Sequence, residues 1–232
     1  MCDANARVRF AKGKAVSNKE TLVNQPRERL INAPWPAVTL VAILFVCFLL
    51  ESAAGIDAVA ARLGFAPRDL ALGVWQPLFT SLFLHGGWIH LLGNSAFALA
   101  FATPAARRMG LDAAGGVVFF IFFLACGVLS NLGFAALDPR DTAPLVGASG
   151  AIAGLMGGAS RLLIPGERLA PFASAPVIGM AGSWVVVNLV IAFFPWAAPG
   201  AGHAIVAWQA HLAGYAAGLL LIAPALRLLG RP

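Results

Sequence analysis

The sequence predicts an all-α integral membrane protein, built as a bundle of six transmembrane helices. Its composition is the first observation: 59% of the 232 residues are hydrophobic, only 11% are charged, and the mean hydropathy is +0.81. Soluble domains carry about 25% charged residues. The second observation is a series of six apolar segments separated by polar breaks. The third is that the basic residues gather at the ends of these segments, as membrane topology requires.

The polar, basic stretch 1–34 comes first, and we expect it to be a disordered cytoplasmic tail. It is far longer than the n-region of a signal peptide. The predicted membrane domain covers residues 35–227, and residues 228–232 form a short cytoplasmic C-terminus. The six predicted segments are residues 35–54, 88–106, 113–137, 145–160, 175–197 and 204–226.

Residues 55–87, between the first two segments, are too polar to span a bilayer and too apolar to form a free loop. Asp57, Arg62 and Arg68 interrupt short apolar stretches, and Pro67 and Pro77 break them. We therefore expect this stretch to lie along the membrane surface.

The basic residues also predict the orientation. With the N-terminus inside, thirteen Lys and Arg residues lie on the cytoplasmic side and three lie outside. This positive-inside bias places both termini in the cytoplasm. The second, fourth and sixth segments then run from outside to inside. The net charge of +6 thus reflects topology, and we expect no nucleic-acid partner.

The three cysteines, Cys2, Cys47 and Cys126, are scattered and show no C-x-x-C spacing. That distribution argues against a disulfide framework or a zinc site. We interpret the three cysteines as packing residues.

Few polar side chains fall within the apolar segments, and these few lie on the three segments that run inward. The second segment carries His90 and Asn94, which are four residues apart and share a helix face. The fourth carries Ser149, and the sixth carries His211. Polar groups are costly inside a bilayer, so each is a candidate functional residue.

Ser149 and His211 are predicted to lie at compatible depths. Ser149 precedes Arg161, at the cytoplasmic end of its segment, by 12 residues, roughly 18 Å. In a hydrocarbon core of about 30 Å, the hydroxyl would lie about 10 Å below the outer surface. His211 precedes Arg227 by 16 residues, roughly 24 Å. The difference is about one helical turn, which helix tilt absorbs.

The stretch Gly147-Ala148-Ser149-Gly150 has two interpretations. Flanking glycines leave the hydroxyl exposed at a tight turn into a helix, as a nucleophile requires. The alternative is a packing role, because Gly150-x3-Gly154 is a small-xxx-small pattern.

Glycines on the sixth segment favour a nucleophile–base pair. Gly214 and Gly218 follow His211 on the same side of the helix, so the fourth and sixth helices can approach and bring Ser149 to the imidazole. No Asp or Glu lies at this level of these segments. The pair would be a dyad without the carboxylate of a triad, and packing would hold the ring.

His90 and Asn94 suit a different role, as hydrogen-bond donors to an oxyanion formed when the hydroxyl attacks a carbonyl. The backbone N–H of Ser149, at a helix N-terminus, would add a third donor.

Three motifs resemble those of the rhomboid family of intramembrane serine proteases, in order and spacing across residues 36–226. They are His85-x4-His90-x3-Asn94, Gly147-Ala148-Ser149-Gly150 and Ala210-His211-Leu212-Ala213-Gly214-x3-Gly218. Any one motif is weakly specific, whereas three on the correct helices are strongly specific.

The resemblance implies a rhomboid-like bundle in which Ser149 is the nucleophile and His211 the general base. His90, Asn94 and the Ser149 N–H would stabilise the oxyanion. Structural or substrate-proximal roles would fall to a further set: His85, Gly147, Gly150, Gly214 and Gly218.

The resemblance also implies an intramembrane serine endopeptidase that cleaves transmembrane segments near the outer face. Its partners would be transmembrane protein substrates and the lipid bilayer, without metal or cofactor. The first loop, 55–87, would be a membrane-embedded hairpin, residues 195–204 a cap, and the fifth helix a lateral gate.

Two positions depart from the family pattern. Gln76 follows Trp75 where members often carry Arg, and Ala153 replaces an aromatic that supports the catalytic imidazole in relatives. The sequence therefore does not identify the residue that orients the His211 ring. Trp184 and Asn188 share a face of the fifth helix; we interpret them as packing residues, with a gate contact as the alternative. His203 is interpreted as solvated or interfacial.

Two other classes compete with a protease. A non-catalytic rhomboid-like protein usually loses the Ser or the His, and both are present. A transporter typically shows intramembrane acids or internal repeats, and neither is found. The basic cytoplasmic tail fits a bacterial inner membrane best. The sequence predicts no oligomeric state.

Overall fold

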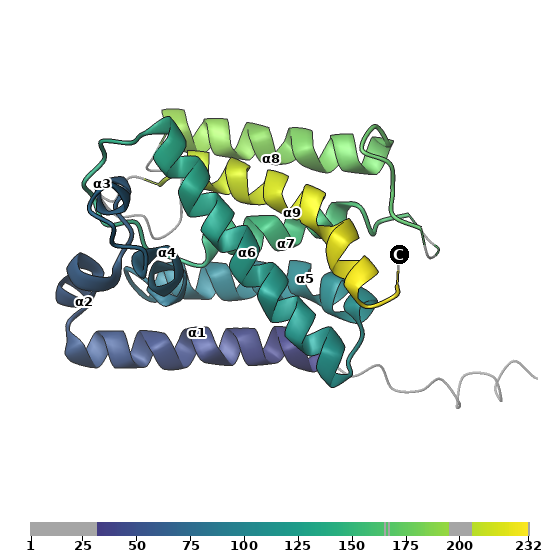
Figure 1. Ribbon diagram of the computed structural model, residues 1–232, viewed down its shortest axis with the longest axis horizontal. Coiled ribbons are helices and arrows are strands. Elements are labelled where there is room, and N and C mark those ends of the chain that lie inside the picture. Colours follow the sequence, from purple (N-terminus) through teal and green to yellow (C-terminus); the bar gives the residue numbers. More distant parts are fainter. Residues whose placement is uncertain (1–31, 165, 167, 195–205, 232) are drawn as a thin grey trace, which may run out of the picture. The chain divides into compact units, whose positions relative to one another are not determined.

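The structure is a computed structural model that describes residues 32–164, 166, 168–194 and 206–231. The described chain is helical, and its elements are α1 (Trp35–Ala54), α2 (Ile56–Leu63), α3 (Pro67–Ala71), α4 (Pro77–Thr80), η1 (Ser81–Phe83), α5 (Trp88–Met109), α6 (Ala113–Leu137), α7 (Ser149–Ser160), α8 (Ala175–Phe193) and α9 (Trp208–Leu228) (Figure 1). The predicted tail, the cap 195–204 and His203 fall almost wholly outside the described residues.

Five of these helices, α1, α5, α6, α8 and α9, are long and apolar enough to cross a membrane; the search covered the described residues. The predicted all-α membrane class is therefore confirmed. The fourth predicted segment is different: its helix, α7, has 12 residues, roughly 18 Å, against a hydrocarbon core of about 30 Å.

The predicted start of the fourth segment at residue 145 is wrong. Leu145 is extended, and its backbone pairs with that of Phe65 through N–H···O bonds of 2.7 and 2.9 Å. The helix begins only at Ser149. Four other limits also shift: α5 ends at Met109, α8 ends at Phe193, and α9 begins at Trp208 and ends at Leu228. The prediction placed these limits at 106, 197, 204 and 226.

Residues 55–87 fold into the short elements α2, α3, α4 and η1. Phe65 and Leu78 are buried with Phe134 of α6 and Ala210 of α9. The stretch therefore packs against the bundle, while Trp75 at its centre is 58% exposed.

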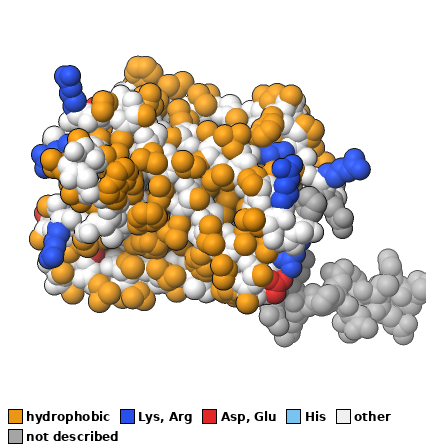
Figure 2. All heavy atoms as spheres, viewed as in Figure 1, with side chains coloured by type: hydrophobic (Ala, Val, Ile, Leu, Met, Phe, Trp, Pro, Cys, Tyr) orange, Lys and Arg blue, Asp and Glu red, His pale blue; other side chains and the backbone are white. Residues whose placement is uncertain are grey.

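Helix α7 forms the centre of the bundle. All its residues from Gly150 to Ser160 are buried, and it packs against α5, α6 and α9. Helix α8 is different, because only Val177 and Asn188 are buried in it. On the face that Figure 2 shows, the surface over the middle of the helices is largely apolar, and Lys and Arg side chains lie towards the helix ends.

Glycines bring α7 and α9 into backbone contact. A methyl group at Gly214 would overlap the carbonyl oxygen of Gly150, and one at Gly218 would overlap that of Gly154. Only hydrogen atoms fit between the two backbones at these points, as in other close helix pairs of membrane proteins.

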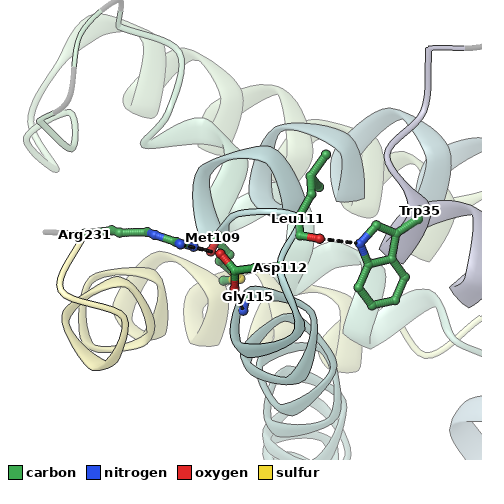
Figure 3. A network of polar contacts seen from close by, with 6 residues as sticks. All are labelled: Trp35, Met109, Leu111, Asp112, Gly115 and Arg231. Atoms are coloured by element: carbon green, nitrogen blue, oxygen red, sulfur yellow. Dashed lines mark hydrogen bonds and ion pairs between the residues drawn. The ribbon is translucent and has the colours of Figure 1, made fainter.

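A polar network joins four helix ends on the side opposite the N-terminus of α7 (Figure 3). Arg231 donates to the carbonyl oxygen of Met109 and, at 2.5 Å, to the Asp112 carboxylate. Its hydrogen bond holds the pKa of Asp112 below the ordinary value. Asp112 also caps α6, and the Trp35 indole donates to Leu111 at 2.8 Å. This network fixes the ends of α1, α5, α6 and α9.

We predict that Gly218→Ala destabilises the protein, because the methyl group forces α9 away from α7. The expected loss is about 1–3 kcal/mol, as for other overpacked cores, read as a lower thermal unfolding midpoint in detergent. Gly182→Ala on α8 is the matched control, since its methyl group meets nothing within 4 Å. Equal midpoints for the two variants would contradict the backbone contact.

Candidate active site

The chain is held tightly where it enters α7. The Gly147 N–H donates to the carbonyl oxygen of Ser81 at 2.9 Å, and Gly147 has φ +128°, a backbone conformation that favours glycine. Ala148 offers no side-chain cap. The N–H groups of the first turn of α7, beginning with Ser149, therefore have no partner within the helix.

Gly150 lets α6 approach the start of α7. A methyl group there would overlap the hydroxyl of Ser130, and that hydroxyl donates to the carbonyl oxygen of Ala210 at 2.7 Å. Asn131, next to Ser130, donates to Ser81 at 3.1 Å. These buried amide and hydroxyl groups, which the sequence reasoning missed, tie together the elements around Ser149.

The structure brings Ser149 and His211 together. His211 is the fourth residue of α9, and its Nε2 lies 2.9 Å from the Ser149 hydroxyl oxygen. Both side chains are partly buried. The glycine contacts bring the backbones of α7 and α9 so close that the Ser149 and His211 side chains can form a hydrogen bond.

The other ring nitrogen of His211 has a partner that the sequence interpretation did not assign. Nδ1 lies 2.9 Å from Oδ1 of Asn188, which is fully buried. The Trp184 ring stands 5.8 Å from the imidazole, measured between centroids. The side chains interpreted as packing residues thus surround His211, whereas Ala153 contributes no ring. A polar amide in an otherwise apolar helix is the sequence signal that marks Asn188.

His90 and Asn94 line the same cavity as Ser149 and His211, and its volume is about 590 Å³. The Asn94 side chain is 7% exposed, and its Nδ2 has no hydrogen-bond partner among the described residues. A methyl group at Gly147 would lie 2.8 Å from Nε2 of His90 and 3.6 Å from Nδ2 of Asn94. Both side chains therefore reach the chain just before Ser149.

His85 lies behind this cavity and does not line it. Its backbone N–H donates to the buried Glu51 carboxylate at 2.8 Å, and its ring stands edge-on to His90 at 5.2 Å between centroids. Burial, reinforced by His90, lowers the pKa of His85 to about 3. The ring is therefore neutral at physiological pH and braces His90. The described residues contain no group of three His, Cys, Asp or Glu side chains suited to a metal.

Fold and site together define a helical membrane protein with a serine hydroxyl hydrogen-bonded to a histidine beside a cavity. The family model described as Rhomboid domain matches residues 72–228, more than half of the chain. The chain belongs to the rhomboid family, and it is an integral, multi-pass membrane protein.

A curated relative is similar over part of the chain. It is the Bacillus subtilis (strain 168) protein described as "Putative rhomboid protease YdcA", 41% identical over 88 residues. The match covers 38% of this chain and 41% of the relative's length. The likeness therefore concerns less than half of either protein.

Proposed function

We propose that this protein is an intramembrane serine endopeptidase that cleaves transmembrane segments of other membrane proteins. The observation that carries the proposal is the 2.9 Å contact between the Ser149 hydroxyl and Nε2 of His211. Membership of the rhomboid family and the family relative described as a protease support it.

The reaction would begin with the Ser149 hydroxyl attacking the carbonyl carbon of the scissile peptide. Its proton passes to Nε2 of His211, which later gives it to the leaving amine. The resulting acyl-enzyme is an ester on Ser149. Water, activated by the same imidazole, hydrolyses this ester and restores the free hydroxyl.

The oxyanion of each tetrahedral intermediate would be held by His90, the Asn94 amide and the Ser149 N–H. A buried donor without a partner is costly in the resting protein, and Asn94 Nδ2 is such a group at the cavity wall. An oxyanion supplies the missing acceptor. The first turn of α7 adds the positive end of its helix dipole.

The residues given structural or substrate-proximal roles would shape this site and take no part in proton transfer. They are His85, Gly147, Gly150, Gly214 and Gly218. Gly147 gives room to His90, and His85 braces the His90 ring from behind. Gly150, Gly214 and Gly218 allow the helix contacts that set the Ser149–His211 distance.

The shortness of α7 explains how such a site reaches into the membrane. If Arg161, which follows α7, lies at the cytoplasmic surface, a helix of roughly 18 Å ends below the outer surface of a 30 Å core. We therefore propose cleavage near the outer face. The positive-inside bias of the Lys and Arg residues is the ground on which we propose cytoplasmic termini, and the basic stretch 1–34 is the ground for a bacterial inner membrane.

We predict that a fluorophosphonate probe labels the purified protein at Ser149. Ser149→Ala should abolish labelling, and His211→Ala should slow it by roughly a thousandfold or more, because the hydroxyl then has no base. Ser160→Ala is the matched control: Ser160 is also buried in α7, but it donates to the carbonyl oxygen of Gly157. Undiminished labelling of His211→Ala would refute the assigned base.

Asn94→Ala should lower kcat for a transmembrane substrate roughly a hundredfold, with little change in KM. Removing one oxyanion donor in other serine proteases costs about that much. The neighbouring Ser95→Ala is the control, since Ser95 donates to the carbonyl oxygen of Leu91. An Asn94→Ala variant with wild-type kcat would remove this residue from the proposed oxyanion site.

A further inference from the structure

A histidine that serves as general base through Nε2 must carry its proton on Nδ1. The neutral ring has one N–H and one lone pair, and the group that binds the N–H selects the tautomer. Triad enzymes use a carboxylate for this purpose. In this protein the atom facing Nδ1 of His211 is Oδ1 of Asn188, at 2.9 Å.

The orientation of the Asn188 amide follows from its second hydrogen bond. Nδ2 lies 2.8 Å from the carbonyl oxygen of Trp184. A carbonyl oxygen can only accept, so the amide nitrogen must face Trp184 and the amide oxygen must face His211. That oxygen in turn accepts a hydrogen bond from the Nδ1–H group of His211. The lone pair of Nε2 is then directed at Ser149.

Asn188 is also exceptional within its own helix. Only 11% of the apolar window of α8 is buried, against 44% for α9, yet Asn188 is fully buried. A buried amide is costly unless its hydrogen bonds are made. In this position both are made, one to α8 itself and one to His211.

Trp184, one turn before Asn188, strengthens the same contact. Its indole Nε1 donates to the carbonyl oxygen of His211 at 3.4 Å, and its ring lies at 40° to the imidazole. Helix α8 therefore holds both the backbone and the ring of His211. Ala153 on α7 has no aromatic ring to support the imidazole, and the side chains of α8 provide that support instead.

We propose that Asn188 is the positioning residue of His211: its amide oxygen fixes the tautomer and plane of the imidazole that deprotonates Ser149. The inference rests on the proposed function and adds α8 to the elements that build the site.

The test compares kcat and KM for a transmembrane substrate in Asn188→Leu and Asn188→Asp. The three side chains are similar in size, but Leu removes the acceptor and Asp keeps it. We expect Asn188→Leu to lower kcat roughly 10- to 100-fold, with KM within about twofold of wild type, because one neutral hydrogen bond and the tautomer preference are lost. Asn188→Asp should retain clearly more kcat than Asn188→Leu.

Val177→Ala is the matched control, because Val177 is the other buried residue of α8 and does not line the site. It should leave kcat unchanged. A purely structural Asn188 would give the opposite order: the buried charge of Asp would damage the protein more than Leu. If Asn188→Leu does not fold, Asn188→Ala serves as the acceptor-free variant, with the same expected loss of kcat.

The outcomes separate the two proposals. Wild-type kcat in an acceptor-free variant, or an Asp variant no better than Leu, would overturn the role of Asn188 alone. A wild-type protein that neither cleaves nor reacts with fluorophosphonate would overturn the proposed function and this inference with it.

Discussion

The contact between the backbones of α7 and α9 is the constraint on which the rest of the structure depends. Gly214 faces Gly150 and Gly218 faces Gly154, with no room for a methyl group at either crossing. Lipid tails are as apolar as Leu, so membrane helices gain little from burying large apolar side chains against each other and rely on close packing. The same approach brings a Ser and a His, both with short reach, to 2.9 Å. Packing and site geometry thus have one cause.

Several buried polar side chains around the site are hydrogen-bonded to a neighbouring element, whereas the amide nitrogen of Asn94 has no partner among the described residues. Ser130 and Asn131 tie α6 to α9 and to η1, and Asn188 ties α8 to α9. Each such bond is obligatory where water is scarce, because an unpaired group costs several kcal/mol in hydrocarbon. Asn94 departs from this rule at the cavity wall. Under the proposed function, this amide N–H would donate to the oxyanion.

Hydropathy was sufficient to predict the membrane class and most helix limits, since α1 and α6 have the predicted bounds. It failed at residue 145 because 145–148 are as apolar as the helix that follows, and hydropathy does not separate extended from helical backbone. The motifs led to Ser149, His211, His90 and Asn94, which line one cavity. They did not predict the role of Asn188, because its partner, His211, is on another helix. The spacing of residues within one helix cannot predict a contact between two helices. The missing aromatic at Ala153 suggested a gap in the support of His211; the structure places Trp184 and Asn188 there, from α8.

The most direct measurement of the central claim is cleavage of a small panel of model transmembrane substrates by the purified protein in liposomes. Cleavage by wild type, at a bond within or beside the substrate's membrane segment, and none by Ser149→Ala is the predicted result. Intact substrates with wild type, or equal cleavage by Ser149→Ala, would contradict the account.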